Sequence, residues 1–181
     1  EIVNRGREYV IAARDFKELT AGWKRQPVRA KEVKFAAVLE KEIDNSKPPT
    51  DWITIEFMVT ANTKYRFWAF VGGCCEPEMM FKVQGDDVVL TMGDGQSKAF
   101  PIDGPSAISF GATPIGSHSG HGGQTRWGWS RMFELTYPSG GVKRIRFIPA
   151  ARGTALSHFV VSSGRYLQAN PPPPNELENG Q

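Results

Sequence analysis

The stretch Lys64-Tyr-Arg-Phe-Trp-Ala-Phe-Val-Gly-Gly-Cys-Cys75 is the most strand-like run in the chain. Successive side chains of a strand point to opposite faces, so the set that starts at Tyr65 faces one way and the set that starts at Arg66 faces the other. Aromatic and apolar residues occur in both sets, which predicts a central strand covered on both faces. Gly72-Gly73 ends the run, and two adjacent cysteines follow.

The rest of the chain has the pattern of short strands separated by turns. Residues 52–59 alternate in the same way, and the turn at 60–63 joins them to the run above, which predicts an antiparallel hairpin. Further strand candidates lie at 9–13, 33–39, 80–84, 88–92, 106–110, 127–135, 142–148 and 156–161. The sequence has no convincing long helical pattern. The predicted fold class is therefore all-β, an antiparallel β-sandwich.

The length of the chain fits one domain with a tail. We place the sandwich at residues 1–166 of the 181-residue chain. Four consecutive prolines at 171–174 predict a stiff linker, and residues 175–181 form a polar tail, so the second segment is 167–181. A linker at this end suggests one module of a longer protein.

Charge and cysteine content narrow the function classes. A net charge of +3 is no nucleic-acid signature, and no apolar run approaches the roughly 20 residues that span a bilayer. Two neighbouring cysteines make neither a disulfide scaffold nor a zinc ribbon. Basic residues cluster in 17–34 and 143–146. They are either solvated faces or a surface that attracts an acidic partner such as a uronic-acid polymer.

The sequence contains no recognisable catalytic motif. It has no nucleophile elbow, phosphate-binding loop, dinucleotide-binding glycine motif or zinc-protease helix motif. The carboxylate pair Asp86-Asp87 occupies a turn position, where aspartate is favoured for backbone reasons. We therefore predict a non-enzyme that carries no cofactor.

Four motifs in order resemble a known family. They are Tyr9-Val-Ile-Ala-Ala-Arg-Asp-Phe16, Lys64-Tyr-Arg-Phe-Trp-Ala-Phe-Val71, Trp127-Gly-Trp129 with Ser139-Gly-Gly-Val-Lys-Arg-Ile-Arg-Phe147, and Gly153-Thr-Ala-Leu-Ser-His-Phe-Val-Val161. Together they resemble carbohydrate-binding module families 6 and 35, which are galactose-binding-like jelly rolls. The resemblance implies a non-catalytic, secreted or extracytoplasmic module that binds a plant or microbial polysaccharide and adjoins other domains.

The resemblance also locates a structural calcium site, and this chain departs from it. The positions that match the family's carboxylate ligands are Ala12, Arg14 and Ser157. Calcium needs several oxygen ligands, usually including carboxylates, so we predict that this site is absent. The alternative is a shifted alignment in which Glu8 or Asp15 serves instead.

Two tryptophans are candidates for stacking on a sugar ring. Trp23 lies in a glycine-flanked turn, where the resemblance places a stacking aromatic, although local packing is the alternative. Trp127 and Trp129 are two residues apart on one strand, face the same side, and are both compatible with the core. The resemblance makes Trp127 the better candidate, while Trp52 and Trp68 are expected in the core.

Cys74-Cys75 allows three interpretations. The pair is reduced and packed, or it forms a vicinal disulfide, or it binds a metal. A bond between adjacent cysteines is strained, and Gly72-Gly73 supplies the backbone freedom for such a turn. A rigid disulfide surface there would pack against a sugar face and shape the rim of the site.

Polar residues in the later loops complete the predicted ligand site. His118, His121 and Gln124 lie in the Gly/Ser/His-rich stretch 111–125, and Arg152 lies in the loop before the last strand, where the resemblance places polar ligand contacts. The two histidines are sugar ligands, plain loop residues, or metal ligands together with the cysteines.

Two other functions remain open from the sequence. One is an accessory sandwich that packs on a neighbouring catalytic or redox domain. The other is a metal-dependent enzyme that uses His118, His121 and the cysteines.

Overall fold

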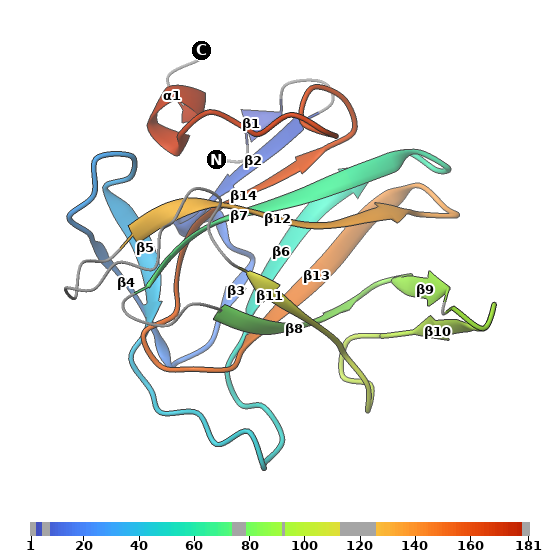
Figure 1. The fold of residues 1–181 in the computed structure, drawn as a ribbon, viewed down its shortest axis with the longest axis horizontal. Coiled ribbons are helices and arrows are strands. Elements are labelled where there is room, and N and C mark those ends of the chain that lie inside the picture. Colours follow the sequence, from blue (N-terminus) through green and yellow to red (C-terminus); the bar gives the residue numbers. More distant parts are fainter. Residues whose placement is uncertain (1–2, 5–7, 74–78, 92, 113–125, 179–181) are drawn as a thin grey trace.

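The computed structural model describes residues 3–4, 8–73, 79–91, 93–112 and 126–178, and its architecture is an antiparallel β-sandwich (Figure 1). This confirms the fold class predicted from the sequence. No helix in these ranges is long and apolar enough to cross a membrane.

The first sheet is organised around its last strand, β14 (Ala155–Ser162). One edge of β14 pairs with β2 and, where β2 ends, with β5, while the other edge pairs with β7. Its other members are β1 (Val3–Asn4), β2 (Glu8–Ala12), β4 (Trp23–Pro27), β5 (Phe35–Leu39), β7 (Lys64–Gly73) and β12 (Arg126–Thr136). The strand-like run 64–73 is therefore an interior strand, β7, with β12 and β14 as its neighbours.

The second sheet has the order β11-β8-β13-β6-β3 and faces the first across the core (Figure 1). Its strands are β3 (Glu18–Leu19), β6 (Ile53–Val59), β8 (Met79–Gly85), β11 (Ile108–Ala112) and β13 (Gly141–Pro149). A small hairpin of β9 (Val89–Thr91) and β10 (Ser97–Ala99), a 3-10 turn η1 (Ala13–Asp15) and a short helix α1 (Pro174–Glu178) complete the described elements.

The predicted hairpin between residues 52–59 and 64–71 is wrong, because β6 and β7 lie in different sheets. Each strand has an apolar face that packs into the shared core, where the Phe57 and Phe67 rings meet edge to face at 5.4 Å. Between the strands, Asn62 adopts a left-handed conformation with φ of 56°. Two consecutive strands can bury their apolar faces in the same core either as neighbours in one sheet or as members of the two facing sheets of a sandwich.

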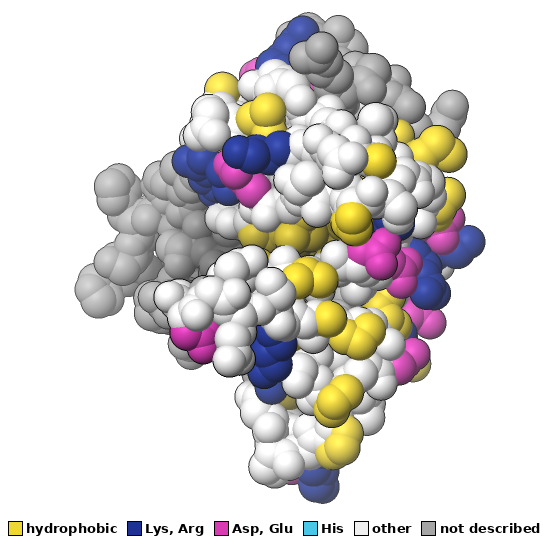
Figure 2. Space-filling model, turned by 90° about the vertical axis from the view of Figure 1, so that its right-hand side faces the viewer, with side chains coloured by type: hydrophobic (Ala, Val, Ile, Leu, Met, Phe, Trp, Pro, Cys, Tyr) yellow, Lys and Arg dark blue, Asp and Glu magenta, His cyan; other side chains and the backbone are white. Residues whose placement is uncertain are grey.

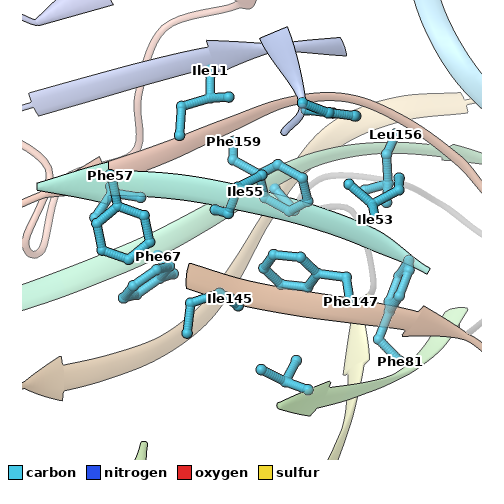
Figure 3. Packing of buried hydrophobic residues seen from close by; sticks show 14 of the residues in the cluster. Ile11, Ile53, Ile55, Phe57, Phe67, Phe81, Ile145, Phe147, Leu156 and Phe159 are labelled. Atoms are coloured by element: carbon cyan, nitrogen blue, oxygen red, sulfur yellow. The ribbon is translucent and has the colours of Figure 1, made fainter. Parts of the chain in front are cut away.

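The main core lies between the sheets and is built from aromatic and branched side chains of both (Figure 3). Phe147 of β13 and Phe159 of β14 stack at 4.3 Å between ring centroids, with an interplanar angle of 19°. Ile55, Ile145 and Phe159 are each completely buried. Alternation therefore places one apolar set of every major strand inward.

A second hydrophobic cluster covers the outer face of the first sheet. It contains Trp68, Phe70 and Trp129, together with Leu177 from α1, which is 2% exposed. The structure here differs from the linker expected at 167–181, because residues 167–178 pack on this face. The buried Trp129 indole donates a hydrogen bond to the Pro172 carbonyl of this segment, and the buried Trp68 indole donates one to the carbonyl of Tyr166, just before it. Residues 179–181 lie outside the described residues.

Candidate functional site

An open groove of about 840 Å³ lies at one end of the first sheet. Its floor comes from β5, β12 and β14, one wall from the end of β4 and the residues after it, and the other wall from the loops 42–43 and 150–153. The lining residues are Gln26, Pro27, Val28, Arg29, Val38, Glu42, Ile43, Trp127, Ala150, Ala151, Arg152, Gly153 and Ala155.

The register of the sheet explains why this end is hollow. One transverse row runs Trp127, Gly72, Ala155, Val38 and Lys24 across five adjacent strands. Directly paired residues share a face, so these side chains point the same way. Glycine and alanine in the middle of the row leave space between the large indole of Trp127 and the β4–β5 wall.

Gly72 also determines how the Trp127 ring lies. A Cβ atom built on Gly72 would lie 2.5, 2.6 and 2.8 Å from the Trp127 indole atoms Cε2, Cδ2 and Cζ2, respectively. The indole therefore lies over the Gly72 backbone, which only a residue without a side chain permits. Trp127 is half-buried and lines the groove, so the ring forms part of its floor.

Two aromatic neighbours support the Trp127 ring from the sheet side. Phe70, two residues before Gly72, lies nearly parallel to Trp127, with ring centroids 5.9 Å apart and an interplanar angle of 16°. Trp129 in turn contacts Phe70 edge to face at 5.0 Å. Alternation along β7 and β12 places these rings on the same face as Gly72 and Trp127. The floor residue is thus the exposed end of a buried aromatic row.

The β13–β14 loop holds Arg152 at the opposite wall. Backbone hydrogen bonds from Gly153 to Leu39 and from Leu39 to Thr154, both 2.9 Å, tie this loop to β5. Gly153 has φ of 87°, a conformation suited to glycine. The Arg152 guanidinium forms an exposed ion pair with Glu42 at 3.2 Å, a contact that is easily exchanged for a ligand.

The groove has a basic character. Arg29 and Arg152 both line it, and both are exposed. Glu42 is the acidic residue among the described lining residues. Gln26 adds an amide that can donate and accept hydrogen bonds. The arrangement combines an aromatic floor with polar and cationic walls, and it suits a ligand that has an apolar face and an edge of hydroxyl or carboxylate groups.

The structure brings together two of the predicted ligand residues, Trp127 and Arg152, from positions 25 residues apart in the chain. Cys74, Cys75, His118, His121 and Gln124 lie outside the described residues. Their proposed roles, including the vicinal disulfide, stay predictions.

Trp23 occupies a different place from the one that sugar stacking requires. It begins β4 and is 6% exposed, with its ring in the main core. It borders a separate hollow beside Asp51 and does not line the groove. Its indole nitrogen has no hydrogen-bond partner among the described residues. Burial of the ring removes the open face that stacking needs, so we leave Trp23 out of the site proposed below.

The positions that match the family calcium ligands are engaged in other contacts. Ala12 pairs with His158 across β2 and β14, and the buried Ser157 hydroxyl lies 2.9 Å from His158 Nδ1. Arg14 lies 3.6 Å from Asp15. Glu8 accepts hydrogen bonds from Ser162 Oγ and the Arg165 amide, at 3.1 and 2.7 Å. In the described part of the chain no three His, Cys, Asp or Glu side chains gather in a way that could hold a metal ion.

Sequence reasoning missed Gln26, Arg29 and Gly72 as parts of this site. In the sequence, Gly72 indicates the end of a strand and backbone freedom for a turn, because its cross-strand partner Trp127 cannot be known without the register. Arg29 belongs to a basic cluster that the sequence showed, but nothing in that cluster indicated which member faces a groove.

A further hollow of about 540 Å³ lies at the opposite end of the sandwich, beside Tyr9, Thr60, Tyr65 and Ser163. Tyr9 is half-buried there, while Tyr65 is buried and its hydroxyl accepts a hydrogen bond from the Thr60 amide at 2.8 Å. Neither Arg nor Lys is among the described residues that line this hollow, in contrast to the groove at Trp127.

Figure 2 views the side of the molecule where the β9–β10 hairpin lies, and hydrophobic side chains gather along the middle of this face.

Comparisons with known proteins agree on the fold. No protein-family model and no curated protein sequence matches this chain. Among solved structures, a family 35 carbohydrate-binding module from Clostridium thermocellum is 13% identical, with 87% of this chain and 98% of that module covered at a TM-score of 0.49. A family 6 module of Cellvibrio mixtus lichenase 5A, in complex with cellotriose, is 11% identical, with 91% and 100% covered at 0.45.

The chain resembles these modules in fold. An Arthrobacter globiformis T6 isomalto-dextranase complexed with panose matches at a TM-score of 0.55 and 11% identity, over 85% of this chain. The chain spans 23% of that enzyme, whereas it spans the full length of the Cellvibrio module. At these identities the likeness to solved structures concerns the β-sandwich fold alone, the fold that the resemblance to families 6 and 35 implies.

Proposed function

We propose that this chain is a non-catalytic carbohydrate-binding module, in an extracytoplasmic protein, whose groove at Trp127 holds part of a polysaccharide. The observation that carries the proposal is the Trp127 indole lying over Gly72 at the floor of an open groove with polar walls. C–H groups of a pyranose ring pack well on an aromatic face while its hydroxyls bond to neighbouring polar groups. A shallow, wet site of this kind predicts modest affinity.

Charge favours an acidic polymer as the ligand. Arg29 and Arg152 line the same groove, and a guanidinium can bind a carboxylate with two hydrogen bonds. A uronate residue stacked on Trp127 would place its carboxylate within the reach of such side chains. This supports uronate-containing polysaccharides over neutral ones.

The test is affinity electrophoresis over neutral and uronate-containing polysaccharides, with and without a chelator. We expect retention by at least one polymer, independent of the chelator, and its loss in Trp127→Ala. The matched control is Trp52→Ala, because Trp52 is a half-buried tryptophan just before β6 of the second sheet, and Arg146 lies 4.2 Å from its ring. Retention of Trp127→Ala equal to that of the unchanged chain, or no retention by any polymer, would refute the proposal.

Arg152→Gln separates the two ligand classes. Its ion pair with Glu42 is exposed, so the substitution should cost less than about 1 kcal/mol of stability. We expect roughly tenfold weaker binding of uronate polymers, which corresponds to about 1.4 kcal/mol, and little change for neutral ones. Equal effects on both classes would contradict carboxylate recognition.

One observation favours a second candidate, an accessory sandwich that packs on a neighbouring domain. Met58 and Val142 are direct cross-strand partners on the second sheet, and they are 58% and 53% exposed. An exposed apolar pair of this kind suits a contact surface. The candidate gains support if no polysaccharide is retained and Met58→Lys abolishes binding to an adjoining domain.

A further inference from the structure

The C-terminal segment 166–178, here called the strap, crosses the outer face of the first sheet, on the side away from the second sheet (Figure 1). Three side chains of β7 and β12 donate hydrogen bonds to its backbone carbonyls. Trp68 Nε1 bonds to Tyr166 at 2.7 Å, Arg66 Nε to Leu167 at 3.1 Å, and Trp129 Nε1 to Pro172 at 2.9 Å. These bonds fasten the strap to the strands that carry Gly72 and Trp127.

The far end of the strap reaches the other side of the groove. The Asn175 amide donates to the Glu32 carbonyl at 3.2 Å, within the connection between β4 and β5. Leu177 and Val33 are both buried in the outer cluster, at 2% and 4% exposure. The strap therefore holds the β4–β5 connection as well as the aromatic strands.

Two groove residues belong to the same cluster. Val28, from the β4–β5 wall, and Trp127, from the floor, both pack against the buried residues under the strap. The path to the floor is short: Trp129 bonds to the strap, its ring meets Phe70, and Phe70 lies beside Trp127. Floor and wall thus share one support that lies outside the groove.

We infer that the strap is a positioning element of the groove, which sets the Trp127 ring and the β4–β5 wall relative to one another. As regards ligand affinity, this rests on the function proposed above. Packed interiors transmit displacements because they contain few voids, so a loosened strap should shift both groove surfaces. Leu177 and Pro172 do not line the groove themselves, and they would act through Val33 and Trp129.

The experiment compares full-length Leu177→Ala and Trp129→Phe with Val83→Ala. Val83 is fully buried in β8 of the second sheet and belongs to the main core, so its truncation costs stability without touching the strap. Affinity for the retained polysaccharide is measured by titration calorimetry well below each melting temperature. We expect the dissociation constant to rise roughly fivefold or more in the two strap variants, because fivefold is the lower end of the usual range of coupling between two sites. The dissociation constant of Val83→Ala should stay unchanged.

Hydrogen exchange and the Trp127 indole N–H resonance supply a readout that needs no ligand. The strap variants should exchange faster at the amides of 175–178, which follow the four prolines, and at 28–34, with a shifted Trp127 resonance and unchanged protection in β6 and β13. Faster exchange at 175–178 with an unmoved Trp127 resonance, or with wild-type affinity, would overturn the inference. If the unchanged chain retains no polysaccharide, the proposed function fails, and the exchange and resonance data still decide whether the strap positions the groove.

Discussion

Gly72 and Trp127 form a pair in which the missing side chain of one makes room for the ring of the other. A methyl group at position 72 would lie 2.5 Å from the indole, closer than carbon atoms approach. The pair is therefore the most sensitive point of the proposed site, although Gly72 itself offers no group to a ligand.

Gly72→Ala should displace the Trp127 ring and weaken polysaccharide binding roughly tenfold or more, which corresponds to about 1.4 kcal/mol. The matched control is Gly93→Ala, because a Cβ on Gly93 would have nothing within 4 Å. Binding and the Trp127 indole resonance report the outcome. A Gly72→Ala chain that binds normally would show that the ring position is not needed.

Two buried tyrosines allow a comparison of how much one hydroxyl hydrogen bond contributes to the free energy of unfolding. Tyr137 is fully buried, and its hydroxyl has no hydrogen-bond partner among the described residues, while burial raises its pKa and keeps it neutral. Tyr65 is also buried, but its hydroxyl accepts a hydrogen bond from the Thr60 amide at 2.8 Å.

Tyr137→Phe should leave the free energy of unfolding unchanged or raise it by about 1 kcal/mol, because it removes an unsatisfied polar group. Tyr65→Phe should lower it by about 1 kcal/mol, because the Thr60 amide loses its partner. Urea denaturation of the two variants measures the difference. Equal destabilisation would mean that the Tyr137 hydroxyl has a partner after all.

At the scale of elements, Asp51 joins the 40–52 connection to the turn before β4. Its carboxylate is 3% exposed and accepts hydrogen bonds from Thr20 Oγ1 at 2.9 Å, the Gly22 amide at 2.8 Å and Thr50 Oγ1 at 3.0 Å. Lys41 Nζ lies 3.1 Å away. Burial alone would raise the pKa of Asp51, but these donors outweigh it and lower the pKa below its usual value of 3.8.

A lowered pKa means that the folded state binds the proton of Asp51 less readily than the unfolded chain does. The stabilisation is therefore present above the unfolded pKa near 3.8 and is lost as the pH falls through the lower folded value. Asp51→Asn should cost about 2 kcal/mol at pH 7, because charged hydrogen bonds are lost. Its melting temperature should fall less than that of the unchanged chain between pH 4 and the acid transition.

The control for this prediction is Asp94→Asn, on the exposed β9–β10 hairpin, where the side chain accepts a bond from the Gln96 amide two residues on. It should melt like the unchanged chain at pH 7. An Asp51→Asn chain that melts like this control at pH 7 would show that the buried carboxylate adds no net stability.

The hairpin predicted for 52–59 and 64–71 is wrong in its pairing, although its strands and turn exist. Alternation indicates two strands that each have an apolar face, and the structure has both strands and a turn between them. Whether the strands pair side by side or cross the sandwich depends on which other strands offer free edges. β13 and β3 pair with the two edges of β6, and β12 and β14 pair with those of β7, and all four partners come from distant parts of the chain.

At the scale of the whole molecule, both faces of the first sheet are covered, and the proposed binding groove lies at one end of its outer face. Its inner face forms the main core, and its outer face carries the aromatic row that ends at the groove. The strap covers most of that row, so a stretch of prolines that resembled a linker completes the folded unit. A covered outer face leaves Trp127 as the half-buried member of the row, and this confines the proposed binding to one end of the sandwich.

The all-β class can be predicted from the sequence alone, because alternation with period two is a local property of each strand. Trp127 and Arg152 can also be picked out as candidates, through motifs in the right order. The shared groove of these two residues, the burial of Trp23 and the packing of residues 167–178 on the sheet become visible in the folded chain. The physical reason is that sheet register and long-range burial depend on pairings between distant segments, which no local pattern encodes.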